Sequence, residues 1–304
     1  MHFVRYINAS GDIHIGITVD FRTAHRANVN SIGELLGLRM AEIRATAHES
    51  RGDEEIIDTL LPPVDGHAEV WAAGVTYRQS QHARIEESTQ ASVYELVYDA
   101  ARPEIFFKSV AWRTSGHQER IAIRDDSAVN VPEPELAVVC NRFGEIVGYT
   151  ICNDVSSRSL EGENPLYLPQ AKIYAGACAI GPGIRPAWEI ADPYALSIQL
   201  KIHRRGTPVW TGESSTAELH RKLPDLVDYL FHGDNFPSGA VLSTGTALVP
   251  PLPFTLTSGD IVTISIDELG TLSNSVVEGK AAMSWLTARH NHAASFSAAI
   301  GPAG

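Results

Sequence analysis

Two glutamates and an aspartate are the residues of this sequence whose types and spacing point most directly to chemistry. Glu133 and Glu135 flank Pro134 and run into the apolar segment Leu136-Ala137-Val138-Val139. In an extended chain, residues i and i+2 point to one face, so the two carboxylates would lie side by side. Like charges repel unless a cation lies between them, and Mg²⁺, Mn²⁺ and Ca²⁺ prefer carboxylate oxygens. The pattern predicts a divalent metal site, with Asp154 as a third ligand.

Asp154 would reach the two glutamates through a predicted hairpin. Two β-rich segments separated by turn-forming residues lie between residues 136 and 153. A turn centred on residues 142–143 would place Thr150 opposite Glu135, whereas a centre two residues later would place Asp154 there. The sequence leaves both registers open. It also leaves open a second interpretation of the acids, as a solvated strand end beside proline-rich turns.

Charged residues near these acids suit an anionic substrate. The net charge of −12 repels anions at long range, so a local attraction is needed, which a bound cation or inward-facing Lys and Arg would supply. Arg158 lies four residues after Asp154, and Lys172 follows further on. Glu104 and Lys108 share one face of a predicted strand. They are either an acid and a base of the site or a salt bridge on a surface strand.

The elements that must position these residues are mainly short strands. Residues 1–64 read as a small α+β module, with a helix from Ser31 to Ala47 that Ser31 caps, and with Pro62-Pro63 at its end. A glycine turn, Thr244-Gly245-Thr246, can bring backbone N–H groups and a hydroxyl close to a ligand. The expected strands are 3–7, 13–19, 70–75, 103–108, 136–140, 146–153, 198–203, 207–211, 240–243 and 261–266, and a second helix is expected over 219–231.

Composition and motifs exclude several classes of protein. The net charge of −12 argues against binding to nucleic acid, and the nucleotide-binding and serine-hydrolase motifs are missing. No stretch approaches the roughly 20 apolar residues needed to cross a bilayer, and the N-terminus lacks an apolar signal core. The three cysteines, Cys140, Cys152 and Cys178, have no metal-ligand spacing and are expected to be buried free thiols. We therefore expect a cytoplasmic protein with no membrane or nucleic-acid partner.

Several separated motifs together resemble the fumarylacetoacetate hydrolase superfamily, in the order found there and over residues 70 to about 280. Within it, the segments 102–108 and 163–170 look closest to the 2-keto-3-deoxy-D-arabinonate dehydratases. The segments that carry the resemblance are 103–108, 132–139, 148–158, 170–176, 244–246, 259–260 and 270–272.

The resemblance implies a fold, a cofactor and an assembly. The expected fold is a β-rich α+β structure, in which a β-sandwich roll over residues 65–287 follows the small N-terminal domain 1–64 and precedes a flexible tail, 288–304. The implied cofactor is Mg²⁺ held by Glu133, Glu135 and Asp154, with Mn²⁺ or Ca²⁺ as alternatives. The implied assembly is a homodimer or a dimer of dimers.

The resemblance also implies an activity. A 2-keto acid would chelate Mg²⁺, and loss of a C3 proton would give a metal-stabilised enolate. Lys172 and Glu104 would share the roles of base and acid, because a neighbouring cation favours a neutral lysine. Lys108 and Arg158 would bind the substrate, and Thr246 would contact its carboxylate. Dehydration of a 2-keto-3-deoxy sugar acid, such as 2-keto-3-deoxy-D-arabinonate, would then give 2,5-dioxopentanoate.

One departure from the superfamily pattern bears on this prediction. Hydrolases of the superfamily resemble G-K-N-Y-x-x-H at the segment that here reads Gly74-Val75-Thr76-Tyr77-Arg78-Gln79-Ser80. Ser80 stands where their water-activating histidine would be, and His82 is two places away. The alternative functions are a metal-dependent hydrolase or decarboxylase of an acylpyruvate or oxaloacetate, and a non-catalytic metal-binding scaffold.

Overall fold

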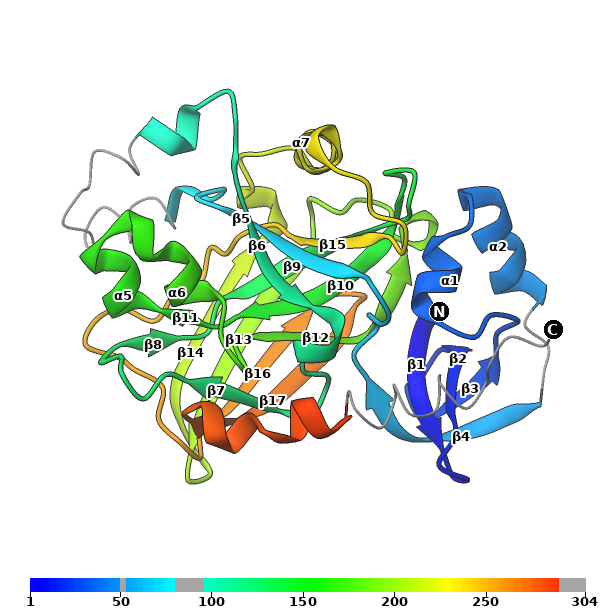
Figure 1. Ribbon diagram of the computed structural model, residues 1–304, viewed down its shortest axis with the longest axis horizontal. Coiled ribbons are helices and arrows are strands. Elements are labelled where there is room, and N and C mark those ends of the chain that lie inside the picture. The colour runs from blue at the N-terminus through cyan, green and yellow to red at the C-terminus, as the bar shows by residue number, and fades with distance from the viewer. Residues whose placement is uncertain (50–52, 80–95, 290–304) are drawn as a thin grey trace.

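Two β-sheets form the main body of the computed structural model, which describes residues 1–49, 53–79 and 96–289. Figure 1 shows the sheets one above the other, with a smaller unit built from the N-terminal residues at one side. The expected β-rich α+β class is confirmed, since short helices lie outside a largely β body. The longest described helix has 11 residues, and no helix among the described residues meets the length and hydropathy of a membrane span.

The larger sheet has ten strands, and the strands that carry the predicted acids lie in its middle. Its order is β2 (Ile13–Thr18), β3 (Thr23–Arg26), β4 (Glu54–Leu61), β1 (His2–Asn8), β12 (Cys178–Pro186), β10 (Ile146–Asp154), β9 (Pro134–Cys140), β15 (Ala240–Ser243), β5 (Glu69–Gly74) and β6 (Glu104–Val110).

The smaller sheet has five strands, and a two-stranded ribbon lies apart from it. Its order is β14 (Thr207–Ser215), β13 (Ser197–Arg204), β16 (Ile261–Ile266), β17 (Gly270–Glu278) and β7 (Arg120–Ile123), and the ribbon joins β8 (Asn130–Val131) to β11 (Ser156–Ser157). The helices are α1 (Ile32–Leu36), α2 (Met40–Glu49), α5 (Arg158–Glu163), α6 (Leu168–Lys172) and α7 (Leu223–Gly233).

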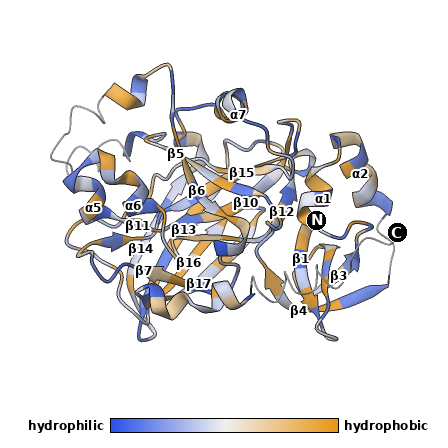
Figure 2. Ribbon diagram, in the orientation of Figure 1, coloured by the Kyte–Doolittle hydropathy of each residue, from blue (hydrophilic) through white to orange (hydrophobic). Residues whose placement is uncertain are grey.

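Strand β9 is apolar on both faces because both faces are covered. Leu136 and Val138 belong to the core between the two sheets, while Ala137 and Val139 belong to a second core that includes residues of α1. Successive residues of a strand point to opposite faces, so the run of apolar residues fills both cores. Figure 2 shows hydrophobic residues along the central strands of both sheets. By the same alternation, Glu135 lies on the face that carries Ala137.

The hairpin of β9 and β10 has a register that differs from both predicted ones. Glu135 pairs with Cys152, and a register shift falls between Ile146 and Gly148. The backbone N–H of Asp154 donates to the carbonyl of Glu133 at 3.0 Å. Asp154 therefore stands opposite Glu133 rather than Glu135, because Cys140 pairs with Ile146 across the turn and the shift then adds one residue to β10.

The N-terminal helix predicted over Ser31 to Ala47 is two helices, α1 and α2. Ser31 caps α1 as predicted, accepting a hydrogen bond from the Glu34 N–H. The break follows from bonds to the β9–β10 turn. The carbonyl of Leu36 accepts from the Arg142 N–H, and the Met40 N–H donates to the Glu145 carboxylate. These contacts satisfy backbone groups at the break, so the chain turns there without leaving them unpaired.

Helix α7 begins later than predicted. Leu219 forms an isolated bridge with Tyr77, and the His220 N–H donates to the Thr76 carbonyl at 3.0 Å. The segment before α7 is therefore extended, and the helix starts at Leu223, with Pro224 in its first turn. Proline is well tolerated at that position because its missing N–H would have no partner inside the helix.

The division into domains at residues 64 and 65 stays a prediction. Within the ten-stranded sheet, strand β1 pairs with its neighbour β12 through one residue pair, Phe3 with Ile184. The core around α1 also includes residues of β9. Of the predicted tail, residues 288 and 289 are described, and the Arg289 guanidinium lies 2.6 Å from the Glu119 carboxylate. Residues 290–304 lie outside the described residues.

Candidate active site

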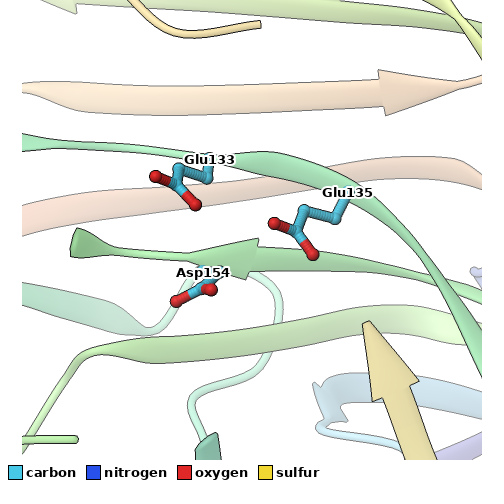
Figure 3. A group of neighbouring side chains, drawn as sticks. All are labelled: Glu133, Glu135 and Asp154. Carbon is cyan, nitrogen blue, oxygen red and sulfur yellow. The ribbon is translucent and has the colours of Figure 1, made fainter. Parts of the chain in front are cut away.

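Glu133, Glu135 and Asp154 come together at one end of β9 and β10. Each offers a ligand oxygen, and these oxygens lie within 4.8 Å of one another. Figure 3 shows the three carboxylates near one another on two neighbouring strands. No more than 2% of any of these residues is exposed, so the interpretation as a solvated strand end is wrong. The cluster supplies only hard oxygen ligands, and that donor set fits Mg²⁺.

Lys172 at the end of α6 bridges two of these acids. Its ammonium lies 2.8 Å from Glu133 Oε2 and 3.1 Å from Asp154 Oδ2, and it also donates to the Ser156 hydroxyl at 2.6 Å. The lysine is 1% exposed. Burying an ammonium is costly unless it is paired and hydrogen-bonded, and here three oxygens surround it.

Lys108 and Arg158 complete the charge balance. The Lys108 ammonium contacts Asp154 Oδ1 and donates to the carbonyls of Val155 and Lys172. Arg158, at the start of α5, lies 2.9 Å from Glu133 Oε1. Three buried cations therefore contact two of the three buried carboxylates, Glu133 and Asp154. The interpretation of Lys108 as part of a salt bridge on a surface strand is wrong, because this lysine is 1% exposed.

A β-bulge aims Lys108 at the cluster. Val70 of β5 pairs with Ser109, but the next residue, Trp71, pairs with Phe107, so Lys108 is an extra residue in β6. Such a bulge locally bends and twists its strand, which redirects the side chain.

Glu135 differs from the other two acids in its surroundings. Its Oε2 accepts hydrogen bonds from the Ser243 hydroxyl at 2.5 Å and from the Gly245 N–H at 2.8 Å. Burial, and then the negative charges of Asp154 and Glu133, raise the pKa of Glu135 to about 8, while Lys172 and the Ser243 hydrogen bond oppose the rise. A cation at this carboxylate would stabilise its charged form.

Glu104 lies on the same sheet face as the acids. It pairs with Gly74, and Phe106 pairs with Ala72 two residues along. Ser243 pairs with both Ala72 and Ala137, and Ala137 is two residues from Glu135. Directly paired residues share a sheet face, and so do residues two apart in one strand. Glu104 therefore lies on the same face as Glu135.

Thr246 is buried in the glycine turn but already has hydrogen bonds. Its hydroxyl donates to the Leu248 carbonyl at 3.2 Å and accepts from the Leu248 N–H at 3.1 Å. The sequence predicts that Thr246 contacts the substrate carboxylate. For that contact its hydroxyl would have to rotate away from Leu248. Ser80 and His82, at the departure from the superfamily pattern, lie outside the described residues.

Three further residues touch the cluster: Ser156 and Ser243, which the sequence did not single out, and Gly245, which it named only as part of the Thr244-Gly245-Thr246 turn. Their backbone positions were visible as a serine pair after Asp154 and as the start of the glycine turn. Their contacts were not, because each reaches its acid or lysine across strands or across a helix. The three cysteines are free and buried, as predicted.

Comparison with known proteins assigns the chain to a family. The model of the fumarylacetoacetate (FAA) hydrolase C-terminal family matches residues 69–277. The chain belongs to this family. The match covers more than half of the chain and includes all three acids and Lys172, so the resemblance noted from the sequence is confirmed.

Two relatives in the FAA hydrolase family to which the chain is similar are named as dehydratases. A Haloferax volcanii protein named "Probable 2-keto-3-deoxyxylonate dehydratase" is 45% identical over 284 residues, which is 90% of this chain and 95% of the relative. The 2-dehydro-3-deoxy-D-arabinonate dehydratase of Saccharolobus solfataricus is 48% identical over 217 residues, covering 70% of this chain and 72% of the relative.

A solved structure supports the same grouping. The 2-keto-3-deoxy-D-arabinonate dehydratase complexed with magnesium and 2,5-dioxopentanoate has a TM-score of 0.79 and 39% identity, covering 92% of this chain and 100% of that one. The fold expected from the sequence, a roll of this family after N-terminal strands and helices, is thus confirmed.

Proposed function

We propose that this protein is a Mg²⁺-dependent dehydratase of a 2-keto-3-deoxy sugar acid such as 2-keto-3-deoxy-D-arabinonate, with 2,5-dioxopentanoate as the product. The observation that carries the proposal is the buried cluster in which Lys172 contacts two of three convergent carboxylates. The identity to two dehydratases, at 45% and 48%, supports the choice of reaction within the family.

Glu133, Glu135 and Asp154 would hold the ion, since their oxygens lie within 4.8 Å of one another and are its preferred ligands. When bound, Mg²⁺ supplies positive charge that draws electrons toward the keto group of the substrate. Lys108 and Arg158 bring further positive charge to the same place and would orient the substrate anion.

Lys172 and Glu104 would carry the proton transfers. Loss of water from the substrate needs removal of the proton at C3 and protonation of the hydroxyl that leaves from C4. Lys172 is held at the cluster by Ser156, and Glu104 lies on the same sheet face. Thr246 would contact the substrate carboxylate after its hydroxyl turns away from Leu248.

Substitution of Lys172 tests this function. We expect Lys172→Met to lower kcat for dehydration of a 2-keto-3-deoxy-pentonate by at least about 100-fold, because proton transfer by a positioned group contributes about that much or more. Formation of the semialdehyde product would be followed. The exposed lysine of β13, Lys201, provides the control, and Lys201→Met should retain the wild-type rate.

The same assay separates the alternative functions. Unchanged dehydration by Lys172→Met would remove the lysine from the mechanism. Turnover of an acylpyruvate or oxaloacetate in place of the keto-deoxy acid would favour the hydrolase or decarboxylase. A metal-binding scaffold predicts no turnover of any of these, and metal binding that a 2-oxo acid does not tighten.

We also infer a cytoplasmic location, which the composition and the free cysteines suggest, and an assembly as a homodimer or dimer of dimers, which the family resemblance suggests. Some large hydrophobic side chains are exposed in the single chain, including Trp112 at 39% and Leu252 at 57%. Light scattering on the purified protein would measure the assembly, and a monomer would contradict it.

A further inference from the structure

The three acids of the cluster are not held in the same way. Glu133 contacts two cations, Lys172 and Arg158, and Asp154 contacts two lysines. Among the described residues, the hydrogen-bond donors to Glu135 are both neutral: the Ser243 hydroxyl and the Gly245 N–H. Glu135 is therefore the acid whose negative charge the protein itself balances least directly.

Both donors to Glu135 act on the same oxygen. They converge on Oε2, at 2.5 and 2.8 Å, and no described residue donates to Oε1. A carboxylate fixed through one oxygen has a defined orientation, since both donors resist rotation of the group. Oε1 is therefore available to an external ligand. Glu133 and Asp154 offer further oxygens within 4.8 Å, so this ligand would be a metal ion.

The two donors come from the end of β15 and the turn that follows it, and hydrogen bonds hold this segment in place. Ser243 ends β15 and pairs with Ala137, two residues from Glu135. Beyond it, the Thr244 hydroxyl donates to the Leu136 carbonyl at 2.8 Å, and the Thr76 hydroxyl donates to the Thr244 carbonyl at 2.6 Å.

Gly245 must be a glycine at this place in the loop. Its φ is +90°, and a Cβ there would lie 2.0 Å from the Thr76 hydroxyl oxygen. Any side chain would displace the loop and, with it, the N–H that binds Glu135.

From these contacts we infer that Ser243 is a positioning residue for the metal, acting by orienting the ligand Glu135. The inference deepens the proposed function and rests on it. Groups that hydrogen-bond to a metal ligand fix its direction, and their loss typically weakens metal binding by 10-fold to 100-fold. Ser243 directly precedes the turn that carries Gly245 and Thr246, so the segment that orients the metal ligand continues into the residue proposed to contact the substrate carboxylate.

Direct measurement of metal binding tests the inference without the reaction. The metal-free full-length protein would be titrated with Mg²⁺ by calorimetry, and with Mn²⁺ by electron paramagnetic resonance. We expect Ser243→Ala to raise the Kd by at least about 10-fold. Ser109→Ala is the matched control, because Ser109 is a buried serine of the same sheet whose hydroxyl donates to a backbone carbonyl; its Kd should equal that of the wild type.

Two further variants keep the test decisive. Ser243→Thr retains a hydroxyl and should recover most of the affinity that Ser243→Ala loses. If Ser243→Ala does not fold, Ser243→Cys replaces it, since a thiol of similar size is a weaker donor and should also raise the Kd. Circular dichroism would establish that each variant is folded.

The outcomes separate this inference from the proposed function. If the wild-type protein binds Mg²⁺ and Ser243→Ala binds it within 2-fold of the same Kd, Ser243 does not position the metal, although the metal site stands. If the folded wild-type protein binds neither ion at millimolar concentrations, both the metal site and the role of Ser243 are overturned.

Discussion

At the scale of single residues, Lys108 shows how strongly the cluster depends on its balance of charge. Its ammonium contacts Asp154 and two backbone carbonyls, and the side chain is fully enclosed. We expect Lys108→Met to lower the free energy of unfolding by about 3 kcal/mol, because removing one partner leaves a buried carboxylate poorly compensated. Urea denaturation of the metal-free protein would measure the change.

The control for Lys108 is again the exposed Lys201 of β13. Replacing Lys201 by methionine should change the free energy of unfolding by no more than about 0.5 kcal/mol, as is usual for a surface residue. A loss below about 1 kcal/mol in Lys108→Met would mean that Lys172 alone compensates Asp154.

At the scale of elements, the pairing of β5 with β6 positions Glu104. Gly74 faces Glu104, and a Cβ on Gly74 would lie 2.0 Å from the Glu104 carboxylate oxygen. A flexible side chain can move away, so Gly74→Ala should displace the carboxylate while the strands stay paired. We expect kcat for dehydration to fall by about 100-fold, since a shift of about 1 Å in a catalytic group has effects of that size.

The matched control for Gly74 is Gly233, the last residue of α7, where an added Cβ would meet no atom within 4 Å. Gly233→Ala should keep the wild-type kcat, and both variants should unfold within about 1 kcal/mol of the wild type. Full activity in Gly74→Ala would show that dehydration does not require the present position of Glu104.

At the scale of the whole molecule, His2 connects the N-terminal unit to the five-stranded sheet. Its Nε2 donates to the carbonyl of Glu268, in the turn after β16. Burial, and then the positive charges of Arg185 and the N-terminus, lower the pKa of His2 to about 4. Unfolding would return it to about 6.5. Between these values the unfolded chain binds more protons, so the contribution of His2 to stability is complete above pH 6.5 and is lost as the pH falls toward 4.

This linkage predicts an acid-dependent loss of stability that a substitution removes. On lowering the pH from 7 to 4.5, the wild-type protein should lose about 2 kcal/mol more of its free energy of unfolding than His2→Gln does. Urea denaturation at several pH values would measure it. Replacing the exposed His232 of α7 by glutamine should leave the wild-type pH dependence in place. Parallel curves for His2→Gln and the wild type would show that His2 does not titrate with unfolding.

The sequence by itself determined the chemical components of this protein. The alternation of Glu133 and Glu135 with apolar residues identified the acids, and motif order identified the family and the dehydratase group. Most strands were also predictable, because alternation and turn residues are local properties of the chain. Strand β15, Ala240–Ser243, agrees residue for residue.

Only the tertiary structure decided how those components meet. The register that sets Asp154 opposite Glu133 depends on a shift inside β10, and the bulge at Lys108 depends on pairing with β5. The contacts of Ser243 with Glu135 and of Ser156 with Lys172 join segments 108 and 16 residues apart. Local sequence patterns fix which face a side chain takes within one strand. They do not fix the alignment between strands, which is set by packing and hydrogen bonding across the whole sheet.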